Sequence, residues 1–278
     1  MSTPPTLTVI SLGGGVQSSV MALMAGEGAF HGIPDCAVFA DTHWEPPSVY
    51  EHIAWLEGQL SFPVHVVDNG RSLREDVKAL TNHSGNRRYV DIPVYLKGNG
   101  GESDGIGRRQ CTTNYKIRPI QRKMRELLGM KPGQRVPSNT TVELWLGIST
   151  DEAVRMRDSR DCWMTNRYPL IEAGMSRRDC IDWCEARYYR PLERSACVAC
   201  PFQSRHRWVE TKRRWPELFG EAVEIDRRLR DGLAYVKEPY LHPSRTPLAQ
   251  AVAHDEANLG ESDQRDGFGN ECEGHCGD

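Results

Sequence analysis

Residues 7–19 read LTVISLGGGVQSS, an apolar run that passes through three consecutive glycines into a segment with two serines. We expect a buried strand over Leu7–Ser11 and a helix over Ser18–Ala25. Glycine lets the backbone approach an anion closely, and a helix start presents unpaired N–H groups and the positive end of the helix dipole. The segment therefore predicts a phosphate-binding loop, with a plain strand-to-helix turn as the alternative. It is not a Walker A loop, because no Gly-Lys-Ser/Thr follows the glycines.

The same alternation continues along the chain. Cys36–Ala40 and Pro63–Val67 are expected strands, and helices are expected from Pro46 and over Leu73–Leu80. Alternating strands and helices predict a Rossmann-like α/β fold, a parallel sheet with helices on both faces. Further expected elements are a polar, mobile loop over 82–110, a helix over Lys116–Leu128, a strand over Val142–Ile148, and helices over Arg177–Ala186, Arg205–Trp215 and Pro216–Arg230.

We divide the chain into a nucleotide-binding core over 1–150, a helical elaboration over 151–250 and a mobile acidic tail over 251–278. Residues 71–130 hold 13 Lys/Arg against 6 Asp/Glu, and residues 251–278 hold one Arg against 8 Asp/Glu. A basic centre suits an anionic ligand, whereas an acidic tail is usually solvated. The last 30 or so residues show no helical periodicity.

Composition excludes several classes of protein. Of 278 residues, 26% are charged and 38% hydrophobic, which is typical of a globular enzyme. No apolar run approaches the roughly 18 residues of a membrane helix, and the first residues lack the features of a signal peptide. We therefore expect a cytoplasmic protein without a membrane partner. Nine cysteines, an odd number in a long chain, disfavour a disulfide scaffold and favour metal, cluster or redox chemistry.

The glycine loop resembles the phosphate-binding loop of the adenine nucleotide α-hydrolase-like (PP-loop) superfamily, which includes ATP pyrophosphatases, tRNA thiolases and the PAPS/APS reductases. Pyrophosphatase members carry Ser-Gly-Gly-x-Asp-Ser, and here Gln17 stands in the Asp position. The missing carboxylate fits the reductase branch better than magnesium-assisted cleavage of ATP. Asp41-Thr42 after the second strand loosely resembles a reductase element near the adenosine, with a helix N-cap as the alternative. The nucleotide-binding residues expected from this resemblance are Ser11, Gly13, Gly14, Gly15, Gln17, Ser18, Ser19, Asp41 and Thr42.

Three cysteines from distant stretches form a candidate metal site. Cys197-x-x-Cys200 can chelate one metal or cluster edge, and a distant Cys111 can complete a face. The order Cys111, Lys116, Pro119 and Ile120 resembles that of iron–sulfur APS reductases, although those carry a cysteine pair at the first position. The resemblance implies a 4Fe–4S cluster, and structural zinc is the alternative. We expect Cys36, Cys180 and Cys184 to be core residues, and Cys162 has no assigned role.

The chain end, with Cys272 and Cys276, is similar to the Glu-Cys-Gly-x-His tail of sulfonucleotide reductases. The resemblance implies that one of these thiolates, most readily Cys272, attacks the substrate sulfur. The alternative is a metal-chelating end or a fourth cluster ligand. A Gly-x-x-x-x-Glu-x-x-Arg stretch from Gly147 resembles the reductases' oxyanion-binding element. The expected anion-binding residues are Arg108, Arg109, Lys116, Ser149, Arg155 and Arg160.

The sequence as a whole is most similar to the PAPS reductase family. That resemblance implies an oxidoreductase that reduces PAPS or APS to sulfite and an adenine nucleotide with a thioredoxin-type thiol donor. An ATP-dependent sulfurtransferase using an iron–sulfur cluster is the alternative reading, and a non-catalytic nucleotide-binding module with zinc is a third. No RNA-binding domain is evident, so a nucleic-acid partner is not supported by the sequence. The sequence does not decide whether the substrate is PAPS, APS or ATP. It also leaves open the oligomeric state and the fourth cluster ligand.

Overall fold

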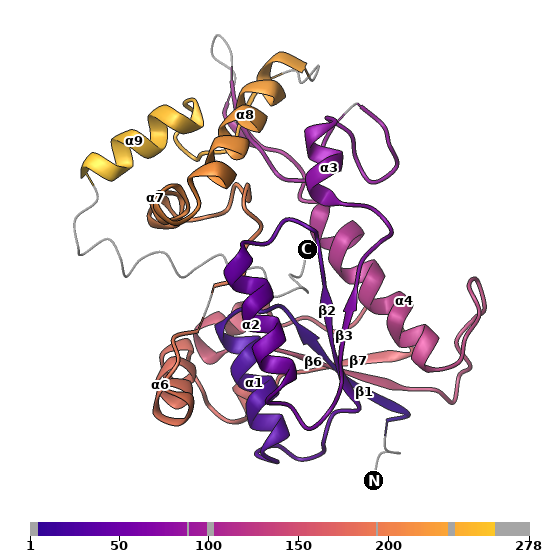
Figure 1. Ribbon diagram of the computed structural model, residues 1–278. Coiled ribbons are helices and arrows are strands. Elements are labelled where there is room, and N and C mark those ends of the chain that lie inside the picture. Colours follow the sequence, from indigo (N-terminus) through magenta and orange to yellow (C-terminus); the bar gives the residue numbers. More distant parts are fainter. Residues whose placement is uncertain (1–4, 88, 99–102, 193, 233–236, 259–278) are drawn as a thin grey trace.

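A computed structural model describes residues 5–87, 89–98, 103–192, 194–232 and 237–258 (Figure 1). Its centre is a five-stranded parallel sheet in the order β3-β2-β1-β6-β7. The strands are β1 (Leu7–Leu12), β2 (Cys36–Ala40), β3 (Val64–Val67), β6 (Val142–Leu146) and β7 (Met164–Arg167). The chain builds the sheet outward from β1 to β3 and then returns to the other side of β1. The α/β fold expected from the sequence is confirmed.

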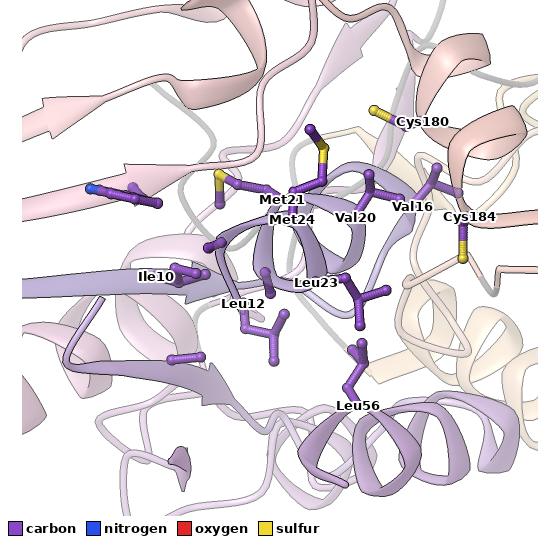
Figure 2. Packing of buried hydrophobic residues seen from close by; sticks show 14 of the residues in the cluster. Ile10, Leu12, Val16, Val20, Met21, Leu23, Met24, Leu56, Cys180 and Cys184 are labelled. Atoms are coloured by element: carbon purple, nitrogen blue, oxygen red, sulfur yellow. The ribbon is translucent and has the colours of Figure 1, made fainter. Parts of the chain in front are cut away.

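Helices cover both faces of this sheet. On one face, α1 (Val16–Gly26) and α2 (Pro47–Glu57) pack with α5 (Pro169–Glu172) and α6 (Arg177–Tyr188) around the side chains of Ile10 and Leu12 (Figure 2). On the other face, α4 (Arg118–Leu127) covers Val9 and Leu144 with its own apolar side chains. Alternate residues of β1 therefore face opposite layers, as the two-residue period of a strand requires.

A second hydrophobic cluster lies beyond the carboxyl ends of β2 and β3 (Figure 1). It is formed by α3 (Leu73–Lys78), α7 (Arg205–Arg214), α8 (Pro216–Gly232) and α9 (Leu248–Asn258). A three-stranded antiparallel sheet in the order β5-β4-β8 packs with these helices. Its strands are β4 (Tyr95–Lys97), β5 (Gly105–Ile106) and β8 (Glu238–Tyr240).

The structure corrects four sequence-based expectations. Part of the expected 82–110 loop forms β4 and β5, which pair with each other, and β4 also pairs with β8 about 140 residues further along the chain. The expected helix at Lys116 begins earlier, as a π-helical segment over Thr112–Ile117 that continues into α4. β7 lies in a region expected to hold only helices and loops, and α9 lies mostly in the stretch expected to lack periodicity. The domain boundaries stay a prediction, although the fifth strand of the main sheet comes from beyond residue 150.

Three of the cysteines are core residues, as expected. Cys36 is buried in β2, and Cys180 and Cys184 of α6 pack against α1 (Figure 2). No helix within the described residues is both long and apolar enough to cross a membrane.

Candidate functional site

The strand order reverses between β1 and β6, and open α/β sheets bind ligands outside the carboxyl ends of strands at such a point. Gly13–Gly15 follow β1 there, and Gly147 follows β6. Gly14 has a φ of +73°, a left-handed conformation that strains any residue with a Cβ. The expected phosphate-binding loop therefore lies at the position where open α/β sheets bind their ligands.

The two loops at this point touch through their backbones. A Cβ added to Gly147 would lie 2.7 Å from both Cα and N of Ser18, closer than any real side chain approaches. Gly147 thus allows the loop after β6 to pack directly on the first turn of α1. This backbone contact holds the loop after β6 against α1.

Gln17 joins the same two loops by hydrogen bonds. Its Nε2 donates to Ser149 Oγ at 3.4 Å and to Glu152 Oε2 at 3.3 Å, and its Oε1 accepts from Arg177 Nη1 at 3.1 Å. The side chain is fully buried. Arg155 in turn donates to Glu152 at 2.7 Å. The structure therefore brings together Gln17, Ser149 and Arg155, which the sequence assigned to nucleotide and anion binding. Gln17 and Glu152 hold the other two in position.

The serines of the glycine loop have partners within the protein. Ser18 Oγ accepts from the Gly13 N–H at 3.2 Å, and Ser19 Oγ lies 2.9 Å from His52 Nε2. Ser11 differs, because its hydroxyl is buried at the end of β1 with no hydrogen-bond partner among the described residues. Of the expected serine contacts to a nucleotide, Ser11 is the one whose hydroxyl is not already engaged.

Asp41 shapes the loop that follows β2. Its Oδ1 accepts from the His43 backbone N–H at 2.7 Å and from the Tyr50 hydroxyl at 2.9 Å. Burial raises the pKa of the Tyr50 phenol, and the charge of Asp41 raises it further, so this hydroxyl remains a hydrogen-bond donor. His43 takes a positive φ of 57° within the turn. Asp41 does not cap α2, since the residue before that helix is Pro46.

A buried polar cluster connects the β2 loop to the Cys-x-x-Cys segment, and Glu45 lies at its centre. The Glu45 carboxylate pairs with Lys116 Nζ at 3.6 Å and accepts from Cys197 Sγ at 3.4 Å. Its other oxygen accepts from Ser195 Oγ at 3.4 Å. Thr42 Oγ1 also donates to Glu45 at 3.4 Å and lies 3.2 Å from Cys197 Sγ. A sulfur atom from residue 197 is thus held beside the loop expected to contact adenosine.

The surroundings of Cys197 disfavour its thiolate form. Burial raises the pKa of its thiol well above the usual range, the charge of Glu45 raises it further, and the charge of Lys116 opposes both. Cys111 and Cys197 pack against the same hydrophobic cluster, and Cys200 is close enough to Cys197 to affect its pKa. Within the described residues, however, no three His, Cys, Asp or Glu side chains are placed to hold one metal ion. We therefore derive no step through a cluster, and both iron–sulfur and zinc stay predictions.

An arginine-lined cleft of about 440 Å³ lies beside the π-helical segment. Arg108 and Arg109 line it as expected anion-binding residues, together with Arg118, His83 and Asn114, which sequence reasoning missed. The many arginines in this part of the sequence could have indicated Arg118 as an anion-binding residue. No local sequence pattern indicates His83 or Asn114. The cleft does not include Lys116, Ser149, Arg155 or Arg160, so the expected anion-binding residues do not form one group.

Asp91 holds two of the residues that line this cleft, His83 and Asn114. Its carboxylate is 1% exposed, lies 3.1 Å from His83 Nδ1 and accepts from Asn114 Nδ2 at 3.0 Å. The backbone carbonyl of Asn114 accepts from Asn69, which follows β3. The cleft is therefore tied to the carboxyl edge of the main sheet. The expected nucleophiles Cys272 and Cys276 lie outside the described residues.

Parts of this chain are similar to known proteins. Residues 7–139 match the family model of the phosphoadenosine phosphosulfate reductase domain. Among solved structures, the chain is similar to the phosphate complex of phosphoadenylyl-sulfate (PAPS) reductase from Candida auris. The identity is 15%, the match covers 69% of this chain and 77% of that chain, and the TM-score is 0.43. No curated protein matches the chain. The match to the PAPS reductase family thus covers residues 7–139, the segment that holds the glycine loop, the β2 loop and the arginine-lined cleft.

Proposed function

We propose that this protein is a sulfonucleotide reductase-like enzyme that reduces PAPS or APS to sulfite and an adenine nucleotide. The observation that supports this most directly is the contact of Cys197 Sγ with Thr42 and Glu45, because it holds a thiol beside the β2 loop that we expect to contact adenosine. The loop at the β1–β6 switch point and the start of α1 would hold the nucleotide phosphates. Arg108 and Arg109 would hold the sulfate or a phosphate, because planar guanidinium groups bind such oxyanions bidentately.

The proposed reaction has two steps whose electrons balance. A tail thiolate, assigned to Cys272, attacks the sulfur atom of the substrate, forms an S–S bond and displaces the phosphate oxygen of the nucleotide. A dithiol donor of the thioredoxin type then gives two electrons, releases sulfite and becomes a disulfide. In this proposal the described residues bind and orient the nucleotide, and Cys272 supplies the nucleophile. A 4Fe–4S cluster at Cys111, Cys197 and Cys200 belongs to this proposal only as a predicted neighbour of the site.

The test measures sulfite release from PAPS and from APS with reduced thioredoxin, after anaerobic purification with iron and sulfide quantified. We expect Cys272→Ser to abolish turnover and to leave nucleotide binding intact. Cys162→Ser is the matched control, because Cys162 is exposed and distant from the site in the chain. Full activity of Cys272→Ser would remove the tail from the mechanism. Pyrophosphate release from ATP, with no sulfite from either sulfonucleotide, would replace the reductase by an ATP-dependent sulfurtransferase.

A further inference from the structure

Helix α4 and the segments on either side of it are strongly basic. Residues 108–135 hold nine Lys/Arg and a single acid, Glu126, a local net charge of +8 in a chain whose net charge is −3. Only one of the nine, Lys116, is buried in the cluster around Glu45. Five of the others are exposed at the surface, namely Arg108, Arg118, Arg122, Lys131 and Arg135.

Three arginines of α4 share one face. Arg118, Arg122 and Arg125 are spaced i, i+4 and i+7, whereas Ile120 and Met124 on the opposite face are buried against the sheet. At 1.5 Å per residue, the three arginines are spread over about 10 Å of the helix axis. The hydrophobic face fixes how α4 sits, so the arginines point away from the core as a row.

These cations are not neutralised by neighbouring acids. Among the described residues, Arg108, Arg118, Arg122 and Arg135 form no ion pair and no side-chain hydrogen bond, and Glu126 is already paired with Lys123 at 2.7 Å. Other exposed arginines contrast with them. Arg178 pairs with Asp182 at 2.9 Å, and Arg227 pairs with both Glu224 and Asp231 at 2.7 Å.

The row of arginines has a cavity at each end. The arginine-lined cleft lies at the start of α4 and includes Arg118. A second cavity of about 600 Å³ lies at the other end, lined by Arg135, Trp163, Ser138 and Thr140. Arg125 stacks over the Trp163 ring with its guanidinium carbon 6.0 Å from the ring centroid, which connects α4 to this cavity. The basic surface is thus longer than one nucleotide needs.

We propose that this surface binds the phosphodiester backbone of a nucleic acid. We call it the α4 basic track, consisting of Arg108, Arg118, Arg122, Arg125, Lys131 and Arg135. Five of these cations are exposed, and Arg125 is half-buried and donates to the Gln134 carbonyl. A row of exposed cations favours a polyanion, because each phosphate they neutralise releases a condensed counterion. Contacts of this kind position a strand without reading its sequence. This binding does not depend on the proposed reductase reaction.

The test titrates labelled 20-residue single-stranded RNA, single-stranded DNA and duplex DNA into the full-length protein and follows fluorescence polarisation between 50 and 200 mM KCl. If all six cations contact phosphates, the logarithm of the binding constant should fall with the logarithm of the salt concentration with a slope of about −4 to −5. Comparison of the three oligonucleotides identifies which nucleic acid the track prefers.

The variant Arg122→Gln/Arg135→Gln removes two track cations that lie outside the arginine-lined cleft. It should make the salt slope shallower by about 1.5 to 2. The matched control, Arg178→Gln/Arg227→Gln, changes the net charge equally on other helices and should bind like the original protein. The proposal is overturned if no oligonucleotide binds at 50 mM KCl or if the two double variants bind alike. It is also overturned if the track variant loses only thioredoxin-dependent turnover, since the track would then bind an acidic protein. Sulfite release in the same samples reports separately on the reductase proposal.

Discussion

The Gln17 side chain connects the glycine loop to two neighbouring segments by hydrogen bonds. Pyrophosphatase relatives have a carboxylate at this position, but an aspartate could not donate to Ser149 and Glu152 as the Gln17 amide does. The amide is also held by Arg177 from the start of α6. Gln17 therefore fixes the start of α1 against the loop after β6 and the start of α6.

Gly147 gives a prediction at the residue scale. The substitution Gly147→Ala would place a Cβ against the backbone of Ser18 and displace the first turn of α1. We expect nucleotide affinity to fall at least tenfold and the free energy of unfolding to fall by about 1–3 kcal/mol, as for other overpacked sites. Isothermal titration and urea unfolding measure the two effects.

Gly220 supplies the control for this substitution. It lies within α8, has an ordinary φ and has no atom within 4 Å of an added Cβ. Gly220→Ala should leave nucleotide affinity unchanged and stabilise the protein by up to about 1 kcal/mol, because alanine is the better helix former. Equal effects of the two substitutions would contradict the close contact between the loops.

At the scale of elements, Asp226 joins three parts of the C-terminal region. This residue of α8 is 1% exposed and accepts from the backbone N–H groups of Leu241 and Leu248, each at 2.9 Å. Arg230 donates to the same carboxylate at 2.6 Å. The first residue of α9 and the end of β8 are therefore held to α8 by a single side chain.

Replacement of Asp226 should destabilise α9 more than the main sheet. We expect Asp226→Ala to lower the free energy of unfolding by about 3 kcal/mol, because two buried N–H groups and a guanidinium lose their acceptor. Hydrogen exchange should become faster in α9 and β8 and stay slow in β1 and β6. Asp231→Ala on the same helix removes only an exposed ion pair and should change stability by less than about 0.5 kcal/mol. Uniform loss of protection across both sheets would argue against the local role of Asp226.

At the scale of the whole molecule, the cysteines divide into buried and accessible thiols. Burial raises the pKa of both Cys36 and Cys184 from 9.0 to about 11. Because these folded-state values lie above the unfolded value, the thiols contribute stability below about pH 9 that is lost as the pH rises toward 11. Cys36 packs in the hydrophobic cluster on one face of the main sheet and Cys184 in the cluster on the other face, so this pH dependence reports on both faces.

This prediction is checked by urea unfolding between pH 8 and pH 11, with Cys36→Ala as the comparison. The original protein should lose stability more steeply than the variant, by at most about 1.4 kcal/mol per pH unit for the one thiol. In the folded protein at pH 8, a disulfide reagent should modify the exposed Cys162 quickly and Cys36, Cys180 and Cys184 only after unfolding. Parallel pH curves for the two proteins would show that Cys36 does not retain its proton in the folded state.

The sequence alone determined the features that local patterns encode. The β1–glycine–α1 unit, the strands β2, β3 and β6, most helices and the three core cysteines follow from periodicity, glycine placement and residue type. The tertiary structure decided what depends on contacts between distant residues. β7 has the weakly apolar sequence MTNR and is a strand because it pairs with β6, and β4 is one because it pairs with β8. Likewise, Glu45 contacts Cys197 only in the folded chain. The contacts of His83 with Asp91 and Asn114 also form only there. Such contacts depend on tertiary packing, which a local sequence pattern does not encode.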